Sequence, residues 1–214
     1  MNILLDDTQR EEYKDIIELL FKLCPDTMQR KMVRANVQQA FVFNMVGSLY
    51  KKNCNILSIG SHEDTAYEAL KQLRIDVIGI DPLLNVSLGT FYEITRDKFD
   101  IIFSTSVIEH VKDDELFIEQ ICKLLKPEGY AILTCDFRND WKEGEPKPSE
   151  DFRLYTKQDL TVRLNNILKQ NGCEMYGEIN YEGEPDFAYG VYWYSFGTFC
   201  FKKNDDNYNY NGYN

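Results

Sequence analysis

One stretch of the chain constrains the fold more than any other. Residues 55 to 81 read NILSIGSHEDTAYEALKQLRIDVIGID, which is a short apolar strand, a polar turn, an amphipathic helix, a second apolar strand and an acid. Two strands that are joined by a helix lie parallel, because the connection crosses back over the sheet before the second strand begins. The stretch therefore predicts a βαβ unit and an α/β fold.

The alternation of strands and helices runs through most of the chain. Apolar strands are expected at 56–59, 77–80, 99–103 and 130–135, and helices at about 64–73 and 113–126. A further helix at about 156–170 and two strands at 173–181 and 192–202 complete the pattern. Short apolar runs that alternate with helices are typical of a mostly parallel sheet with helices on both faces.

The first fifty residues have a different character. Thr8 and Glu11 have the spacing of a capping box, and apolar residues recur at helical spacing as far as Pro25. A second helical pattern covers about 26–50. We therefore predict three regions: a helical extension at 1–52, an α/β domain at 53–203, and a disordered polar tail at 204–214 that has nothing to bury.

The composition excludes several classes of protein. The formal net charge is −11, from 24 basic and 35 acidic residues, which opposes the attraction that drives nucleic-acid binding. No run approaches the roughly 20 apolar residues of a membrane span, and the first residues lack the basic flank of a signal peptide. The six cysteines form no CxxC pair, so we expect reduced thiols in a cytoplasmic protein.

The turn after the first strand contains a single glycine, Gly60. A glycine there would let the backbone lie against a ligand, because it has no Cβ to obstruct the approach. A dinucleotide normally requires the fuller GxGxxG pattern, and Glu63 and Asp64 would repel its pyrophosphate. A nicotinamide cofactor is therefore disfavoured.

An acid, Asp81, closes the second strand and is followed by Pro82. A carboxylate at this position can accept hydrogen bonds from both hydroxyls of a ribose. Asp-Pro also opens turns, so Asp81 has a plain structural interpretation as well. The presence of Gly60 about twenty residues earlier in the same βαβ unit favours the ribose interpretation.

Three blocks of sequence together resemble a known family. They are NILSIGSHEDT, VIGIDP and FDIIFSTSVIEHVKDDELFIEQICKLLKPEGYAILTCDF. The third block is the most specific, because it places a strand, an IEHV loop, a helix ending in LLKPEG and a strand AILT in that order. On these motifs the chain resembles the class I S-adenosylmethionine-dependent methyltransferases, from about residue 55 to residue 203.

The resemblance implies a Rossmann-like, mostly parallel sheet of seven strands in the order 3-2-1-4-5-7-6, with only strand 7 antiparallel. S-adenosylmethionine would lie across the carboxyl ends of strands 1, 2 and 4. The helical extension would cover these strand ends, although a homodimer interface or packing on the flank of the sheet stays open. The residues that match the family's cofactor positions are Gly60, Ser61, His62, Asp81, Pro82, Ser104 and Thr105.

Three features depart from the family pattern. The acid often found at the end of the first strand is Ser58 here. The later glycines of its first turn are replaced by a Ser-His-Glu sequence. The segment between Asp81 and Phe99 is too short for a full helix, a third strand and an adenine-binding loop, so we expect only a minimal strand at about 86–88. Because the first turn has fewer glycines than the family pattern, a catalytically silent, S-adenosylmethionine-binding scaffold protein is the main alternative to an enzyme.

Methyl transfer to a hydroxyl needs in-line placement and a base. Asp136, at the end of the fifth strand, would face the acceptor; it could act as the base or a metal ligand, or be a plain turn residue. His110, in the IEHV loop, could accept a proton near neutral pH or could instead shape the cofactor site. Glu109 lies beside it, but the spacing does not define a metal site, and none is assigned.

Three further residues are expected near the mouth of the pocket, namely Arg138, Arg153 and Tyr155. The arginines could clamp an acidic or phosphate-bearing acceptor, or could form surface ion pairs with neighbouring acids. The chain lacks the Asp/Asn-Pro-Pro-aromatic motif of enzymes that methylate nucleic-acid bases. We therefore expect O-methylation of a small polar acceptor such as a sugar, a sugar nucleotide or a surface-glycan precursor.

Overall fold

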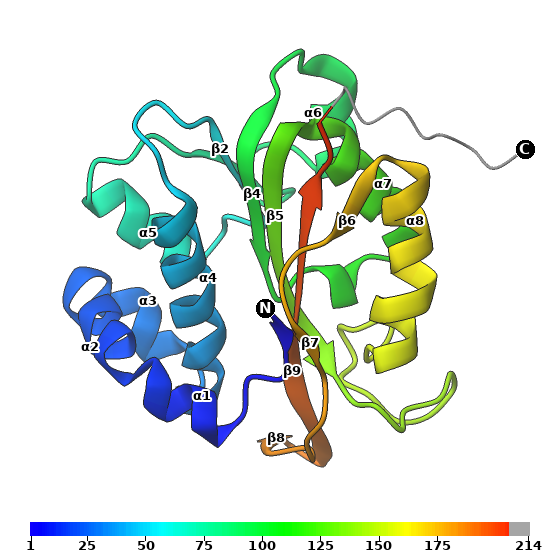
Figure 1. Ribbon diagram of the computed structural model, residues 1–214. Helices are drawn as coiled ribbons and strands as arrows, with labels where there is room; N and C mark the ends of the chain where they lie inside the picture. The colour runs from blue at the N-terminus through cyan, green and yellow to red at the C-terminus, as the bar shows by residue number, and fades with distance from the viewer. Residues whose placement is uncertain (206–214) are drawn as a thin grey trace, which may run out of the picture.

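The centre of the fold is a mixed β-sheet. A computed structural model describes residues 1–205 and shows this sheet between two layers of helices (Figure 1). Neighbouring strands follow the order β3 (Ile78–Ile80), β2 (Ile56–Ile59), β4 (Phe99–Thr105), β5 (Leu125–Phe137), β9 (Tyr192–Lys203) and β6 (Cys173–Met175). Strands β3, β2, β4 and β5 pair in parallel, and β9 runs antiparallel to both of its neighbours. The predicted α/β fold is confirmed.

The edge of the sheet corrects the predicted strand order. No strand forms at 86–88 within the described residues; a turn leads instead into α6 (Leu88–Ile94). Ser87 favours the helix because its hydroxyl accepts a hydrogen bond from the backbone N–H of Thr90, at 3.3 Å. The seventh strand is β8 (Phe187–Tyr189), which pairs with β9 at the other side of the sheet. The order 3-2-1-4-5-7-6 therefore lacks its first member.

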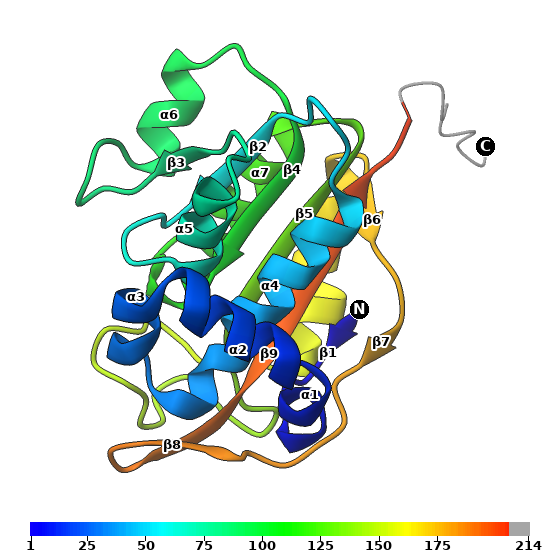
Figure 2. The same cartoon turned by 90° about the vertical axis from the view of Figure 1, so that its left-hand side faces the viewer.

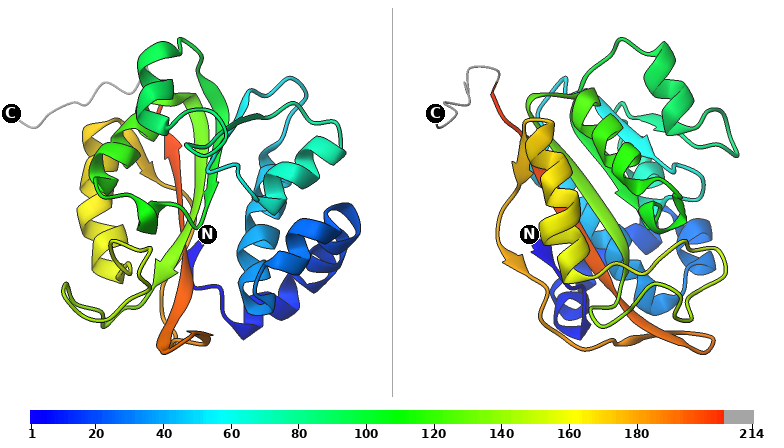
Figure 3. Two further views of the ribbon diagram at one scale, coloured as in Figure 1. Left: turned by 180° about the vertical axis from the view of Figure 1, so that it is seen from behind. Right: turned by 90° about the vertical axis from the view of Figure 1, so that its right-hand side faces the viewer.

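Side chains on the central strands alternate between two cores. Ile101, Phe103 and Ile132 face one layer of helices, and Ile102 and Leu133 face the other, as the period of two in a strand requires. The first layer contains α2 (Lys14–Leu23), α3 (Pro25–Arg30), α4 (Asn36–Leu49) and α5 (Thr65–Gln72) (Figure 2). The second contains α7 (Asp114–Leu124), the π-helical turn η3 (Asp159–Leu164) and α8 (Asn165–Gln170) (Figure 3).

The N-terminal helices differ in detail from the prediction. The first helix is divided into α1 (Asp7–Glu12) and α2, and Asp6 caps α1 by accepting from the Thr8 N–H at 2.7 Å, so the predicted Thr8 cap is wrong. The second is divided into α3, the 3-10 turn η1 (Val33–Ala35) and α4. Pro25 occupies the first turn of α3, where its missing N–H is harmless.

The first residues of the chain pair with its last strands, which the sequence pattern did not indicate. Strand β1 (Asn2–Ile3) runs parallel to β7 (Ile179–Asn180). The buried Asn2 side chain accepts from the Cys200 N–H at 2.7 Å and donates to the Tyr176 carbonyl at 2.9 Å. The stretch before α1 therefore lies alongside β9 and is held by the C-terminal strands (Figure 1).

Three other sequence expectations can be compared with the described residues. The predicted tail at 204–214 lies almost wholly outside them, since they end at residue 205. All six cysteines are free, and all except Cys54 are buried. Among residues 1–205, no helix has the length and apolar character needed to cross a bilayer.

Candidate active site

A cavity of about 800 Å³ opens at the carboxyl ends of β2, β3 and β4. Five of the seven predicted cofactor residues line it: Gly60, His62, Asp81, Pro82 and Thr105. The remaining two, Ser61 and Ser104, are buried behind the lining. A cavity of this size is in the usual range for a small-molecule site, so the predicted residues do come together around a ligand-sized space.

Asp81 has the turn-forming role that the sequence offered, and its ribose-binding role stays a prediction. Its Oδ1 accepts from the Leu83 N–H at 2.8 Å, which is the turn-forming contact of an Asp-Pro sequence. Its Oδ2 accepts from the His62 N–H at 3.3 Å, which fixes the carboxylate against the first turn. Because Asp81 also lines the cavity, its carboxylate keeps lone pairs that a diol could use.

Gly60 is also required for packing, a reason that the sequence did not indicate. Its φ is +80°, in the region that favours glycine, and an added Cβ would overlap Cγ2 of Val107. The missing side chain therefore makes room for the segment after β4, as well as leaving the backbone beside the cavity.

The acidic residues of the first turn are both engaged by the protein. Glu63 forms an ion pair with Arg30 of α3 at 3.3 Å. Asp64 is the N-cap of α5 and accepts from the Tyr67 N–H at 2.6 Å, and burial raises the pKa of its carboxyl. The glycine-poor turn after β2 is therefore supported by side chains from its own helix and from the N-terminal helices.

The N-terminal helices supply cavity residues, none of which sequence reasoning had assigned to the cofactor site. They are Lys31, Ala35, Gln38 and Gln39. Gln39 Oε1 accepts from the Ala66 N–H at 3.1 Å, and Gln38 Oε1 accepts from the Ser106 hydroxyl at 3.2 Å. A signal was present, because two adjacent glutamines lie in a helix whose other residues are mostly apolar, and buried amides need partners.

A second cavity, of about 250 Å³, adjoins the first. The two share four lining residues: Ala35, Gln38, Ser106 and His110. Ser106 stands between them with a φ of +54°, a strained conformation that is held by its N–H donating to the Thr134 carbonyl at 3.2 Å. Backbone strain of this kind is common at functional sites. The sequence had singled out only Ser104 and Thr105, the two residues before Ser106.

Two buried carboxyl groups face the second cavity. Asp136 is 6% exposed, and burial together with the charges of Glu109 and Asp151 raises its pKa well above the usual value. Burial raises the pKa of Glu109 to about 7. Because neighbouring carboxyls disfavour each other's ionisation, the pair holds a proton near neutral pH and can exchange it with a bound group.

His110 lines both cavities and is held by the loop that follows β5. Its Nδ1 lies 3.0 Å from Oδ1 of the buried Asp151 and 3.3 Å from the Glu150 carbonyl. The Asp151 contact is the main reason why the pKa of His110 is raised to about 9. An imidazole that already carries a proton at neutral pH is a poor base, so the geometry favours the site-shaping role over the base role.

This raised pKa predicts a pH-dependent contribution to stability. The folded pKa is about 9 and the unfolded value 6.5, so the stabilisation is complete below about pH 6.5 and is lost as the pH rises through 9. We expect His110→Gln to reduce the free energy of unfolding at pH 6 by more than at pH 10, as measured by urea denaturation. His62→Gln, at an exposed position, is the control. A difference from wild type that is the same at every pH would contradict the expectation.

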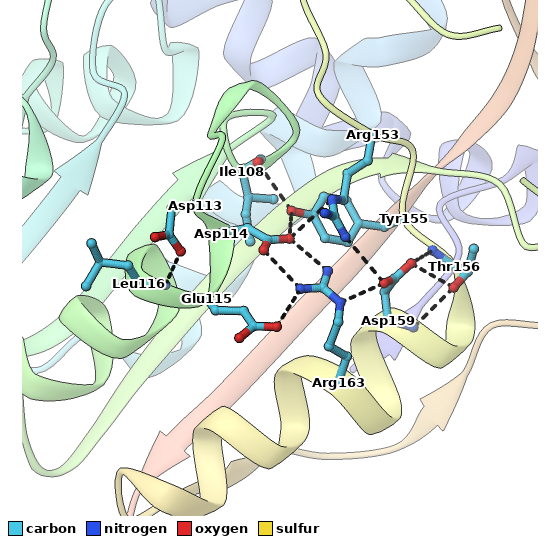
Figure 4. A network of polar contacts seen from close by, with 10 residues as sticks. All are labelled: Ile108, Asp113, Asp114, Glu115, Leu116, Arg153, Tyr155, Thr156, Asp159 and Arg163. Carbon is cyan, nitrogen blue, oxygen red and sulfur yellow. Dashed lines mark hydrogen bonds and ion pairs between the residues drawn. The ribbon is translucent and has the colours of Figure 1, made fainter. Parts of the chain in front are cut away.

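The predicted acceptor residues lie elsewhere. Arg138, Arg153 and Tyr155 line neither of these cavities. Arg138 pairs with Asp140 at 2.8 Å, and Arg153 approaches Asp114 at 3.5 Å (Figure 4). The observed contacts therefore favour the ion-pair alternative for both arginines.

Tyr155 belongs to a buried polar network that lines neither cavity (Figure 4). Its hydroxyl lies 2.8 Å from Asp114 Oδ2 and 3.3 Å from the Ile108 carbonyl. Arg163, from η3, donates to both oxygens of Asp114 at 2.9 and 2.8 Å and to Asp159 at 2.8 Å. The network fixes the 3-10 turn η2 (Ile108–His110), which carries the acid and the histidine of the site.

No group of three or more His, Cys, Asp or Glu residues within 1–205 is arranged to hold a metal ion.

Comparison with known proteins gives both a family and relatives. The model of the family described as "Methyltransferase domain" matches residues 5–176. The ubiquinone biosynthesis O-methyltransferase of Bartonella tribocorum is 28% identical over 167 residues, which are 62% of this chain and 65% of that protein. The chain thus spans slightly less than two thirds of the relative's length.

Solved structures of low identity share the fold. The CcbJ methyltransferase from Streptomyces caelestis is 12% identical with a TM-score of 0.52, and the alignment covers 78% of this chain and 89% of that chain. The [4+2]-cyclase SpnF is 10% identical with a TM-score of 0.53, covering 96% and 100%. Since one of these is titled a cyclase, the likeness establishes architecture and not reaction. The family match covers most of the chain, and the protein belongs to the class I S-adenosylmethionine-dependent methyltransferases.

Proposed function

We propose that the protein transfers a methyl group from S-adenosylmethionine to a hydroxyl group of a small acceptor. The observation that carries the proposal is the junction of the two cavities at Ser106 and His110. The larger cavity has the diol-binding acid of a cofactor site, and the smaller one has carboxyls able to exchange a proton. A donor in one and an acceptor in the other would meet at the junction.

The lining of the larger cavity fits S-adenosylmethionine. Asp81 would accept the ribose hydroxyls, and the apolar side chains of Val86, Leu88 and Val111 would enclose the adenine. The first turn at Gly60 leaves backbone beside the cavity for the amino-acid end. When bound, the cofactor supplies an electrophilic methyl group on a sulfonium sulfur.

The residues of the smaller cavity would handle the acceptor. The pair Asp136 and Glu109 would hold the acceptor hydroxyl by a hydrogen bond and take its proton as the oxygen becomes nucleophilic. His110, fixed by Asp151, would orient groups at the junction without changing its own protonation. Closure of the site by the N-terminal helices would exclude water from the reacting atoms.

The composition of the smaller cavity bears on the acceptor class. Its wall contains Phe187, Tyr194 and Phe196 beside the carboxyls, and no arginine. This lining suits a neutral hydroxyl-bearing ring better than the diphosphate of a sugar nucleotide. The relative's name, an O-methyltransferase of ubiquinone biosynthesis, also supports oxygen as the attacked atom. We therefore rank a phenolic hydroxyl first as the acceptor and a hydroxyl of a neutral sugar second. The cytoplasmic location and the homodimer remain predictions.

Cofactor binding gives the first test. S-adenosylhomocysteine at 100 times its dissociation constant should stabilise the fold by about 2.7 kcal/mol, which raises Tm by roughly 5–10 °C for a chain of this size. Asp81→Ala should remove most of that shift, because the ribose loses its acceptor, while the protein remains folded by circular dichroism. A shift with NAD and none with S-adenosylhomocysteine would overturn the proposal.

The acceptor class is tested by methyl transfer from radiolabelled S-adenosylmethionine to a panel of compounds. The panel contains small phenols, catechols, neutral sugars, sugar nucleotides and RNA. Turnover of a phenol, catechol or neutral sugar is the expected result. Activity confined to RNA or to sugar nucleotides would contradict the acceptor assigned to the smaller cavity.

A further inference from the structure

The smaller cavity has an acidic wall. Its lining, within the described part of the chain, includes four carboxyl groups and one basic side chain, the imidazole of His110. The carboxyl groups are those of Glu109, Asp136, Glu150 and Asp151. The imidazolium offsets one of their charges, and the proton shared by Asp136 and Glu109 offsets a second, so negative charge remains on the wall. A ligand that brings a positive charge would be attracted to it.

Asp151 has an oxygen that the protein leaves without a partner. Its side chain is only 2% exposed, and its Oδ1 lies 3.0 Å from Nδ1 of His110. Within residues 1–205 its Oδ2 has no hydrogen-bond partner, although the residue lines the cavity. Lys147 donates to the backbone carbonyl of Asp151, but it does not line the cavity. Because a buried carboxylate oxygen without a donor is costly, we expect a bound molecule to supply that donor.

Aromatic side chains form another part of the same wall. They are Phe187, Tyr189, Tyr194 and Phe196. Strand pairing sets Asp136 opposite Phe196 and Phe187 opposite Tyr194, so these rings share one face of the sheet with a carboxyl group. The rings of Tyr194 and Phe196 meet at 89°, with centroids 5.8 Å apart, and form an aromatic corner. The face of an aromatic ring attracts a cation, most strongly where water is excluded.

These three features point to one functional group. A phosphate or carboxylate would be repelled by the acidic wall, and an uncharged ligand would leave its charge unused. An ammonium group has three N–H donors for carboxylate oxygens and a positive charge for the ring faces.

Building on the proposed function, we infer that the acceptor carries an ammonium group in addition to its hydroxyl, and that Asp151 and the aromatic corner bind that group. The ring of the acceptor is uncharged, and the charge is on a substituent. A protonated amine has no free lone pair, so the methyl group is transferred to the hydroxyl oxygen.

The test compares probes whose end groups differ in charge. Tyramine, tyrosol and para-hydroxyphenylacetate share a phenol and end in an ammonium, a hydroxyl and a carboxylate group, and glucosamine and glucose form a corresponding sugar pair. Each is titrated by calorimetry into the full-length protein saturated with S-adenosylhomocysteine. In at least one series the ammonium probe should bind about tenfold more tightly than its neutral counterpart, and the carboxylate probe should bind most weakly. Mass spectrometry of the product formed with S-adenosylmethionine should find the methyl group on oxygen.

Asp151→Asn should remove most of the preference for the ammonium probe. The amide keeps an oxygen for His110 and replaces the unpartnered oxygen by an NH₂ group, which repels an ammonium. Glu150→Gln is the matched control, because Glu150 is the adjacent acid and lines the same cavity, but its exposed carboxylate accepts from Ser149 and is screened by water. It should leave the ratio of the affinities close to that of wild type.

The outcomes separate the inference from the proposed function. Equal affinities within both series, binding of no probe, or an unchanged preference in folded Asp151→Asn would overturn the inference; methyl transfer to oxygen would still support the proposed function. Methylation of the amine nitrogen, or failure of wild type to bind S-adenosylhomocysteine, would overturn both. The comparison of probes on wild type does not depend on the folding of any variant.

Discussion

We expect Asp136→Asn to lower kcat by about 10²-fold or more while S-adenosylhomocysteine binds as tightly as to wild type. Asp136 lines the smaller cavity, where burial and neighbouring carboxylates raise its pKa well above the usual value. Because Asp136 and Glu109 disfavour each other's ionisation and hold a proton between them, one carboxylate of the pair stays able to take the proton of an acceptor hydroxyl. Asparagine keeps the shape of the side chain but cannot take the proton. Methyl transfer and calorimetric binding are measured on the same preparation.

His110→Ala provides the comparison for this experiment. Because His110 retains its proton up to about pH 9, its removal should reduce turnover less than the loss of Asp136. The pH–rate profile separates the two roles, since only a proton-transfer group changes the shape of the profile. If both variants turn over like wild type, the base has been placed wrongly. If wild type binds the cofactor and methylates nothing in the panel, the catalytically silent alternative is favoured.

The second large effect concerns stability. Asp114→Ala should lower the free energy of unfolding by about 3 kcal/mol, at the lower end of the range for breaking a buried ion pair. The Asp114 side chain is 5% exposed, and it neutralises Arg163 at 2.8 Å and Arg153 at 3.5 Å (Figure 4). Without it, two guanidinium groups that are largely removed from water lose a partner, and Tyr155 loses an acceptor. Urea denaturation at pH 7 measures the difference.

Asp140→Ala is the matched control, because Asp140 also pairs with an arginine but its side chain is 73% exposed. Surface pairs of this kind contribute at most about 1 kcal/mol, so its effect should be small. Asp114→Asn should fall between the two, since the amide oxygen can still accept from Tyr155. An Asp114→Ala protein as stable as Asp140→Ala would show that the network adds nothing to stability.

The α/β core was predictable because its signals are local. Apolar strands alternate with amphipathic helices, and each pattern depends on residues that are near one another in sequence. The larger cavity was predictable for a similar reason: Gly60 and Asp81 belong to one βαβ unit, and the ends of parallel strands meet at one edge. The helix at 88–94 was missed, because a serine cap decided between helix and strand in a short segment.

Other features depended on contacts between distant segments. The sequence placed Arg153 and Tyr155 at the expected mouth of the pocket. In the structure both contact Asp114, in a network that lines neither cavity. The raised pKa of His110 depends on Asp151, in a loop that folds back over η2. The place of Gln38 and Gln39 in the cavity wall required knowing that α4 packs against β4. Periodicity and motif spacing carry no information on such pairings.

The pairing of β1 with the C-terminal strands also determines how late in translation the sheet can be completed. Asn2 and Cys200 are 198 positions apart, and Leu5 donates its N–H to the Phe196 carbonyl at 2.8 Å. A ribosome that makes this chain releases the helices around the cofactor cavity long before β9, which lies inside the sheet between β5 and β6. Until β9 emerges, one side of β5 has no partner and Leu5 has no place to bury. The nascent chain therefore exposes an unpaired, aggregation-prone strand edge until nearly the whole domain has been translated. A chaperone that covers this edge would have its largest effect at that stage.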